Sequence, residues 1–222
     1  LDIAALLGAD AGSYERFHAR VPGVLAKADY RPRTSAWAVH ERTLWTVRGD
    51  RIEQVAFDAL LLATGATDRT APIPGWTLPG VYTLGGALVL LKSQGCLIGR
   101  QVVLCGSSPL LYLVARQYLA AGARIVAILD TTPLAAKARA LLDLVHVPAT
   151  LARGLGYMAH VRRKGVPIRL GVRLVAFEGT DGLAAVRYAD AGGREHRIAC
   201  DGAAVGFGLK PEAQLADLVS RL

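Results

Sequence analysis

The hydrophobic and polar positions follow their clearest pattern between Gly99 and Asp130. Two runs rich in Val, Ile and Leu, 101–105 and 124–130, predict strands of a parallel sheet that is covered on both faces. Between them, apolar residues at helical spacing predict a helix over 109–121 that packs on this sheet. Those apolar residues are Leu110, Leu111, Val114, Ala115, Tyr118 and Leu119. Strand, tight turn, helix and strand make a βαβ unit, which directs a helix N-terminus at the carboxyl edge of the sheet.

The rest of the chain predicts further helices and two groups of short strands. The predicted helices cover 1–28, with Ser13 as N-cap, and 84–94, 133–144 and 149–164. The predicted strands cover 36–39, 43–47, 52–57 and 60–66, and then 166–170, 173–177, 183–188, 194–200 and 203–206. Residues 179–182, Gly-Thr-Asp-Gly, indicate a hairpin turn. The predicted fold class is α/β, with a β-meander inserted before the last strand of a Rossmann-like βαβ domain.

The turn that begins at Gly106 is the candidate cofactor-binding site. The free amides and the positive dipole end of a helix N-terminus favour a diphosphate, and the predicted contacts at this turn are Gly106, Ser107, Ser108, Pro109 and Leu110. Asp130 ends the second strand about 20 residues later, followed by Thr131, and its carboxylate is expected to accept the ribose hydroxyls. Of the three motif glycines only Gly106 is present, since Ser108 and Leu111 stand at the other two positions. The alternative interpretation is a βαβ unit kept for packing, with a degraded phosphate site.

A hydrolase nucleophile elbow is a rival interpretation of the same turn. Residues 106–108 follow a strand and precede a helix, and Asp190 and His196 come later in the order of such a triad. An elbow of this type uses the backbone N–H of the residue after the nucleophile in its oxyanion hole. Pro109 stands there and has no N–H, so the sequence disfavours a hydrolase.

Composition and charge narrow the classes of function. The 222 residues carry a net charge of +8, mostly arginine with few aromatic residues between, which disfavours nucleic-acid binding and suits phosphate-bearing cofactors or an acidic partner. No apolar run reaches the length of a membrane span. Cys96, Cys105 and Cys200 make no CxxC pair, which fits a reducing cytoplasm and disfavours disulfide reduction. The five dispersed histidines predict no metal site.

Four stretches of the sequence resemble one family. They are 61–66 (LLATGA), 74–81 (PGWTLPGV), 106–111 (GSSPLL) and 201–211 with its core VGFG. Together they resemble the FAD/NAD(P)-dependent pyridine nucleotide-disulfide oxidoreductase-like flavoproteins of the glutathione-reductase type. Within that family they are most similar to the alpha-type subunits of opine oxidase, hydrogen cyanide synthase and hydroxyproline or proline dehydrogenase complexes. The resemblance covers essentially the whole chain.

The resemblance implies two dinucleotide-binding domains, of which this chain is a central fragment. Its parts correspond to an incomplete FAD-type domain (1–80), a connecting helix (81–98), an NAD-type domain (99–210) and the start of the return to the FAD-type domain (211–222). It implies that FAD lies against Ala63, Thr64 and Gly65. It also implies that the face between the two nucleotides is lined by Gly206, Phe207 and Gly208. The other interpretation of both glycine turns is a strand exit that needs a positive φ.

The resemblance also implies cofactors, partners and chemistry. The expected ligand at the Gly106 turn is NAD, or ATP or ADP at the same site, and Asp130 argues against NADP because its carboxylate would repel a 2′-phosphate. FAD is expected in the full-length protein and not in this fragment alone. A flavoprotein subunit is the expected partner, with a homodimer of the fragment as another assembly. The implied function is part of an opine or amino-acid (secondary amine) dehydrogenase or oxidase complex, with no catalytic residue assigned here. An NAD(P)H-dependent flavin reductase and a non-catalytic adenine-nucleotide-binding module are the alternatives.

Overall fold

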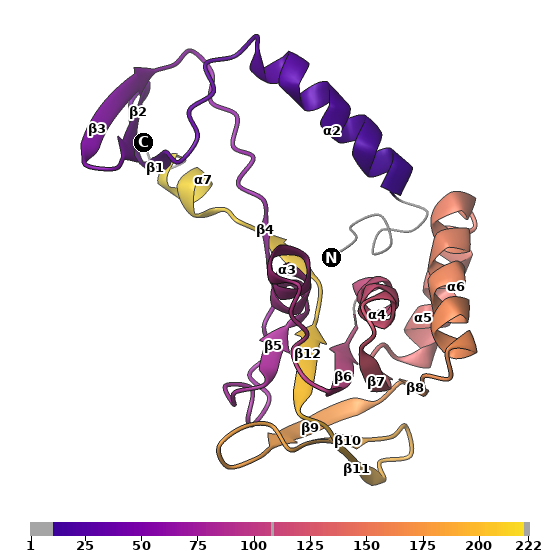
Figure 1. Ribbon diagram of the computed structural model, residues 1–222. Helices are drawn as coiled ribbons and strands as arrows, with labels where there is room; N and C mark the ends of the chain where they lie inside the picture. The colour runs from indigo at the N-terminus through magenta and orange to yellow at the C-terminus, as the bar shows by residue number, and fades with distance from the viewer. Residues whose placement is uncertain (1–10, 108, 220–222) are drawn as a thin grey trace. The chain divides into compact units, whose positions relative to one another are not determined.

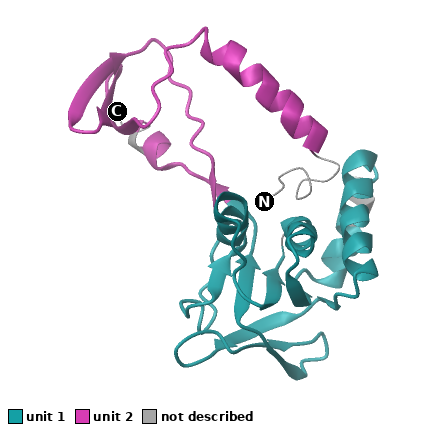
Figure 2. Cartoon of the chain, viewed as in Figure 1, with its two compact units in different colours: residues 1–8, 68–209 teal, residues 9–67, 210–222 magenta. Residues whose placement is uncertain are grey.

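The computed structural model describes residues 11–107 and 109–219 (Figure 1). The described chain divides into two compact units, one of residues 68–209 and one of residues 11–67 with 210–219 (Figure 2). The chain passes between them near β4 (Ala66–Asp68) and β13 (Leu209–Pro211), which pair as a two-stranded sheet.

The larger unit is built on a parallel five-stranded sheet in the order β5-β12-β6-β7-β8. Its strands are β5 (Val81–Thr83), β6 (Gln101–Gly106), β7 (Arg124–Asp130), β8 (Ile168–Leu170) and β12 (Gly202–Gly206). β6 and β7 are joined through a helix, as the sequence predicts, and β12 returns to the other side of β6. This order places the carboxyl ends of three neighbouring strands at one edge of the sheet.

Both faces of this sheet are covered. Helices α3 (Leu84–Gln94), α4 (Leu110–Ala120), α5 (Leu134–Leu144) and α6 (Pro148–Arg163) belong to the same unit as the antiparallel meander of β9 (Arg173–Glu178), β10 (Ala185–Ala189) and β11 (Glu195–Ala199). Figure 1 shows α3 and α4 on the opposite side of the sheet from the meander.

Successive residues of the central strands point into two different cores. Val102 and Leu104 pack with the residues of α3 and α4, whereas Val103 and Cys105 pack with those of the meander. This alternation is what the two-residue period of a strand requires when both faces are buried. The apolar runs of the sequence therefore mark strands covered on both sides, as predicted.

The smaller unit holds a second meander and two helices. Its elements are α2 (Ala11–Leu25), the antiparallel strands β1 (Ser35–His40), β2 (Thr43–Arg48) and β3 (Arg51–Ala56), and α7 (Gln214–Val219). The prediction of three short antiparallel strands in this part of the chain is confirmed.

Three local predictions are wrong. Residues 60–65 form no strand, and Leu61 is 90% exposed. A strand needs a neighbour for its backbone hydrogen bonds, and no strand among the described residues pairs with 60–65. Ser13 lies inside α2, which begins at Ala11, so it is not the N-cap. Leu110 does not pack on the sheet, because it is 38% exposed at the start of α4.

Candidate functional site

The structure brings three of the predicted site residues to one edge of the sheet. Gly106 ends β6 and is in register with Gly206 at the end of β12 on one side and with Asp130 at the end of β7 on the other. Since all three strands are parallel, these residues lie side by side at the carboxyl edge. Ligands of open α/β sheets bind outside the carboxyl ends of the strands. They bind at the point where the strand order reverses.

Gly106 is required by the close approach of β12. Its φ is +130°, and a Cβ atom there would lie 1.9 Å from the carbonyl oxygen of Gly206. That same oxygen accepts a 3.0 Å hydrogen bond from the backbone N–H of Ser107. Gly206 is itself constrained, since its Cβ would lie 2.8 Å from Cδ2 of Leu84. The glycine at the first motif position therefore has a packing reason that is independent of any ligand.

The turn between β6 and α4 is open to solvent. Ser107, Pro109 and Leu110 are exposed, and Ser108 lies outside the described residues. Pro109 is the N-cap of α4 and gives no side-chain hydrogen bond to the helix. Leu111, at the third motif position, is fully buried in the core between α4 and the sheet. The helix thus accommodates a leucine where a small residue is usual and still presents its N-terminal end at the surface.

The carboxylate of Asp130 is enclosed by donors from the protein. Its Oδ2 accepts a 2.6 Å hydrogen bond from the Tyr112 hydroxyl and another from Nζ of Lys137, and its Oδ1 accepts one of 3.0 Å from the backbone N–H of Thr132. Only 4% of the Asp130 side chain is exposed. Burial raises the pKa of this carboxyl, but the hydrogen bonds from Lys137, Tyr112 and Thr132 outweigh it, so the pKa lies below its ordinary value. Asp130 is therefore ionised and already satisfied.

Tyr112 and Lys137 are the site residues that the sequence analysis missed. Tyr112 stands in the first turn of α4 and Lys137 in the first turn of α5, so each lies just after a loop at the carboxyl edge. Lys137 Nζ is also 6.0 Å from the centre of the Tyr112 ring. Burial raises the pKa of the Tyr112 hydroxyl, as does its hydrogen bond to Asp130. The sequence held one signal for Lys137, which is that it lies one turn into α5, the helix that follows Asp130.

Two of the other predicted site residues, Thr131 and Gly208, make backbone hydrogen bonds. The N–H of Thr131 donates to the Gly106 carbonyl over 2.8 Å, which closes the edge between β6 and β7. Gly208 accepts from the N–H of Arg69 over 2.9 Å, and Phe207 is half-buried between the two glycines. The role of these groups at a nucleotide stays a prediction.

Ala63, Thr64 and Gly65 belong to the smaller unit and are exposed. The Thr64 hydroxyl donates to the carbonyl of Glu212 over 2.7 Å, and the N–H of Glu212 donates to the carbonyl of Gly65 over 3.0 Å. Gly65 has a φ of +82°, which is the conformation expected at a strand exit. Their predicted place against FAD remains a prediction.

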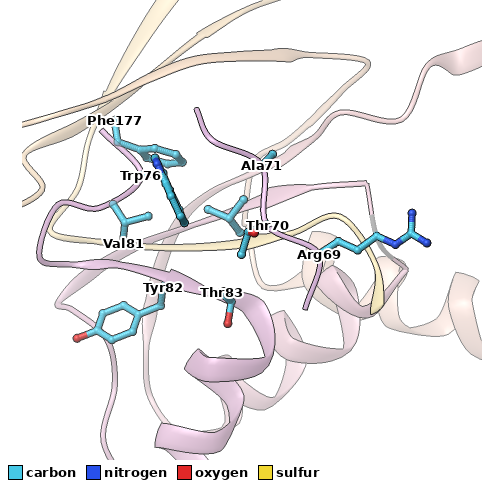
Figure 3. Close-up of a pocket in the computed structure, with 9 residues that line it drawn as sticks. Arg69, Thr70, Ala71, Trp76, Val81, Tyr82, Thr83 and Phe177 are labelled. Atoms are coloured by element: carbon cyan, nitrogen blue, oxygen red, sulfur yellow. The ribbon is translucent and has the colours of Figure 1, made fainter. Parts of the chain in front are cut away.

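A small apolar hollow lies beside β5 in the larger unit (Figure 3). Its volume of about 30 Å³ holds little more than one water molecule. Trp76, Val81, Thr83 and Phe177 are among the residues that line it. The hollow is too small for a nucleotide, so the open edge at Gly106 is the better candidate site.

The pair that the hydrolase interpretation named does form. His196 Nε2 and Asp190 Oδ2 are 2.7 Å apart, and the His196 ring stacks on Tyr188. The hydrogen bond to His196 lowers the pKa of Asp190. The pair lies at the hairpin of β10 and β11, where it borders a hollow of about 460 Å³ along β8. Ser108 is outside the described residues, and the missing N–H of Pro109 still argues against an oxyanion hole.

The remaining reactive groups are inert or scattered. Burial raises the pKa of the Cys200 thiol to about 12 and that of Cys105 further still. Within 11–107 and 109–219, no three His, Cys, Asp or Glu side chains gather as metal ligands. Among the helices that the structure describes, none is long and apolar enough to cross a membrane.

Comparison with known proteins identifies a family and several relatives of this chain. A model of the pyridine nucleotide-disulphide oxidoreductase family matches residues 26–221. An opine oxidase subunit of Rhizobium meliloti (strain 1021) is 42% identical over 176 residues, which are 74% of this chain and 37% of that protein. Hydrogen cyanide synthase subunit HcnB of Pseudomonas protegens is 34% identical over 174 residues, 75% of this chain and 37% of that protein. The chain therefore spans less than two fifths of the length of these two relatives.

Solved structures share the fold. Thioredoxin reductase of T. acidophilum aligns with a TM-score of 0.59 at 15% identity and covers 92% of this chain and 62% of its own. L-Proline dehydrogenase from P. horikoshii aligns with a TM-score of 0.56 at 18% identity and covers 83% of this chain and 29% of its own. At these identities the likeness shows the fold alone.

Proposed function

This chain belongs to the pyridine nucleotide-disulphide oxidoreductase family, and we propose that it is the nucleotide-binding part of a flavin-dependent amine or opine oxidoreductase. The proposed whole enzyme is an opine or amino-acid (secondary amine) dehydrogenase or oxidase complex, in which this chain is part of the alpha-type subunit. The names of the relatives, which are subunits of opine oxidase and hydrogen cyanide synthase, support this assignment. A flavoprotein subunit is the proposed partner.

The observation that carries the proposal is the alignment of Gly106, Asp130 and Gly206 at the carboxyl edge of the sheet. The start of α4 lies at the surface beside it, where backbone N–H groups and the helix dipole attract a diphosphate. The residues present therefore fit the diphosphate of a dinucleotide. They fit the ribose of a dinucleotide less well, because the Asp130 oxygens already accept hydrogen bonds from Tyr112, Lys137 and Thr132.

The proposed work of this chain is to bind and orient. A nicotinamide nucleotide and FAD supply the redox chemistry of such enzymes, and the protein holds them and sets the charge around them. Gly106 lets the chain turn away from β12 without a clash, and the first turn of α4 faces the phosphates. Asp130 holds the first turns of α4 and α5 together through Tyr112 and Lys137. None of the described side chains is assigned a proton-transfer role.

A non-redox adenine-nucleotide module is the second candidate. The enclosure of Asp130 favours it, because a site that has lost the ribose contact retains the diphosphate contact of ADP or ATP. The two candidates share the Gly106 turn and differ in whether the nicotinamide half of the ligand adds affinity.

Calorimetric titration of the 222-residue chain with NADH, ADP and ATP separates these candidates. The proposal predicts saturable binding of the dinucleotide, and the second candidate predicts binding of ADP or ATP alone.

Leu110→Glu places a negative charge at the start of α4, so it is expected to weaken nucleotide binding about tenfold without destabilising the helix.

Val89→Glu is the control, since Val89 is likewise an exposed apolar residue of a helix, here α3. Its nucleotide affinity is expected to equal that of the parent. No binding of any of the three nucleotides contradicts the proposed function.

A further inference from the structure

We propose that Lys137 makes the site select a nucleotide that carries a phosphate on the adenosine ribose, as NADPH does at its 2′ position. This inference rests on the proposed function, because it concerns the sugar end of the same dinucleotide site. It reverses the expectation that Asp130 excludes NADP.

The first step is that the Asp130 carboxylate cannot serve a ribose hydroxyl as it stands. Both of its oxygens accept hydrogen bonds from the protein, and its side chain is 4% exposed. Because the side chain is almost wholly covered, a ribose hydroxyl reaches it only if Lys137 or Tyr112 moves away, which leaves a charged or polar group without its partner at a cost. The ligand therefore meets the groups that cover the carboxylate and not the carboxylate itself.

Lys137 is the charged group that covers the Asp130 carboxylate. The Lys137 side chain is 26% exposed and that of Asp130 only 4%, so a ligand at the surface contacts Lys137 before Asp130. An ammonium has three N–H donors, and the hydrogen bond to Asp130 Oδ2 uses one of them. Two donors are left for a ligand at the position where a dinucleotide fold places the 2′ oxygen, next to the acidic residue that ends the second strand.

The third step is the local charge. An isolated carboxylate at this position repels a 2′-phosphate, and a cation near it accommodates one. Here the charge of Asp130 is neutralised by the ion pair with Lys137. Because the carboxylate is nearly buried and the Lys137 side chain is partly exposed, a ligand at this surface meets the cation first, which favours a phosphate dianion over a neutral hydroxyl.

Calorimetric titration of the 222-residue chain with NADPH and NADH tests this inference, with 2′,5′-ADP and 5′-ADP as probes that lack the nicotinamide half. The parent is expected to bind each 2′-phosphorylated ligand roughly ten- to hundredfold more tightly than its counterpart, as charge-assisted hydrogen bonds to one phosphate predict. Lys137→Ala is expected to lose this preference, and Lys137→Arg to keep it because it retains a cation at the same place.

Lys92→Ala removes an exposed lysine from α3 and is the control, expected to bind like the parent. Thermal unfolding of each variant shows which of them are folded, and the comparison of 2′,5′-ADP with 5′-ADP on the parent carries the test should Lys137→Ala fail to fold. Equal or tighter binding of NADH by the parent overturns the inference and leaves the proposed function standing. An unchanged preference in folded Lys137→Ala also overturns the inference, and binding of no nucleotide at all overturns both.

Discussion

Replacing Gly106 by alanine is expected to lower the free energy of unfolding by about 3 to 5 kcal/mol, with a fall of roughly 10 °C in the unfolding midpoint. Two costs add at this position. The φ of +130° is strained for any residue with a Cβ, and that Cβ would lie 1.9 Å from the Gly206 oxygen. Relief requires β12 to move away from β6, which breaks the register that forms the candidate site. Urea and thermal unfolding measure the loss.

Gly122→Ala separates the two costs. Gly122 follows α4 with a φ of +83°, but a Cβ there meets no atom within 4 Å. It carries backbone strain without a clash, so its expected cost is about 1 kcal/mol. A Gly106→Ala protein as stable as Gly122→Ala would show that β12 is not packed against the turn as the structure has it.

Asp130→Asn is expected to cost about 1 to 3 kcal/mol at pH 7, because hydrogen bonds to a charged acceptor are replaced by weaker ones and Lys137 loses its counter-charge. The cost should depend on pH. The folded-state pKa of Asp130 is lowered from 3.8, so the carboxylate stabilises the fold above that pH and this contribution is lost as the pH falls through the folded pKa. Urea unfolding of parent and variant between pH 7 and pH 3 should therefore show a difference that is constant near neutrality and shrinks below about pH 4.

Asp181→Asn is the control for this titration. Asp181 is exposed in the turn between β9 and β10, so its variant is expected to be as stable as the parent. A difference between Asp130→Asn and the parent that persists undiminished at pH 3 would show that the carboxylate is not held in its charged form by Tyr112, Lys137 and Thr132.

The central strands were predictable from the sequence because their signal is local. Residues 101–105 and 124–130 are apolar at nearly every position, and burial on both faces is the environment that produces such a run. Their parallel pairing, and with it the position of Asp130 beside Gly106, follows from the helix between them. The later meander is marked by Gly-Thr-Asp-Gly at 179–182 in the same local way.

Residues 60–65 show where local signals fail. Their apolar pattern matches that of a buried strand, yet a strand also needs a neighbour to pair with, and the sequence of the segment does not contain that information. β5 was missed for the opposite reason. Its three residues follow Pro79 and Gly80 and carry almost no periodic signal, and the strand that they pair with, β12, lies far away in the sequence.

The ion pair at the candidate site was hidden for a similar reason. Tyr112 looks like one more apolar position of α4, and Lys137 like a solvent-exposed lysine of α5. Their convergence on Asp130 depends on how two loops leave the sheet edge, which motif spacing does not specify. The position of the acidic residue was predictable from the motif, but the groups that cover it were not.

Backbone amide mapping by NMR on the 222-residue chain is the most direct test that the Gly106 edge binds a dinucleotide. On addition of NADH or NADPH, the largest chemical-shift changes are expected at Ser107, Leu111, Tyr112, Thr131 and Thr132, with smaller ones at Gly206 and Gly208. Changes confined to the hollow along β8 near His196, or none at saturating nucleotide, would contradict binding at this edge.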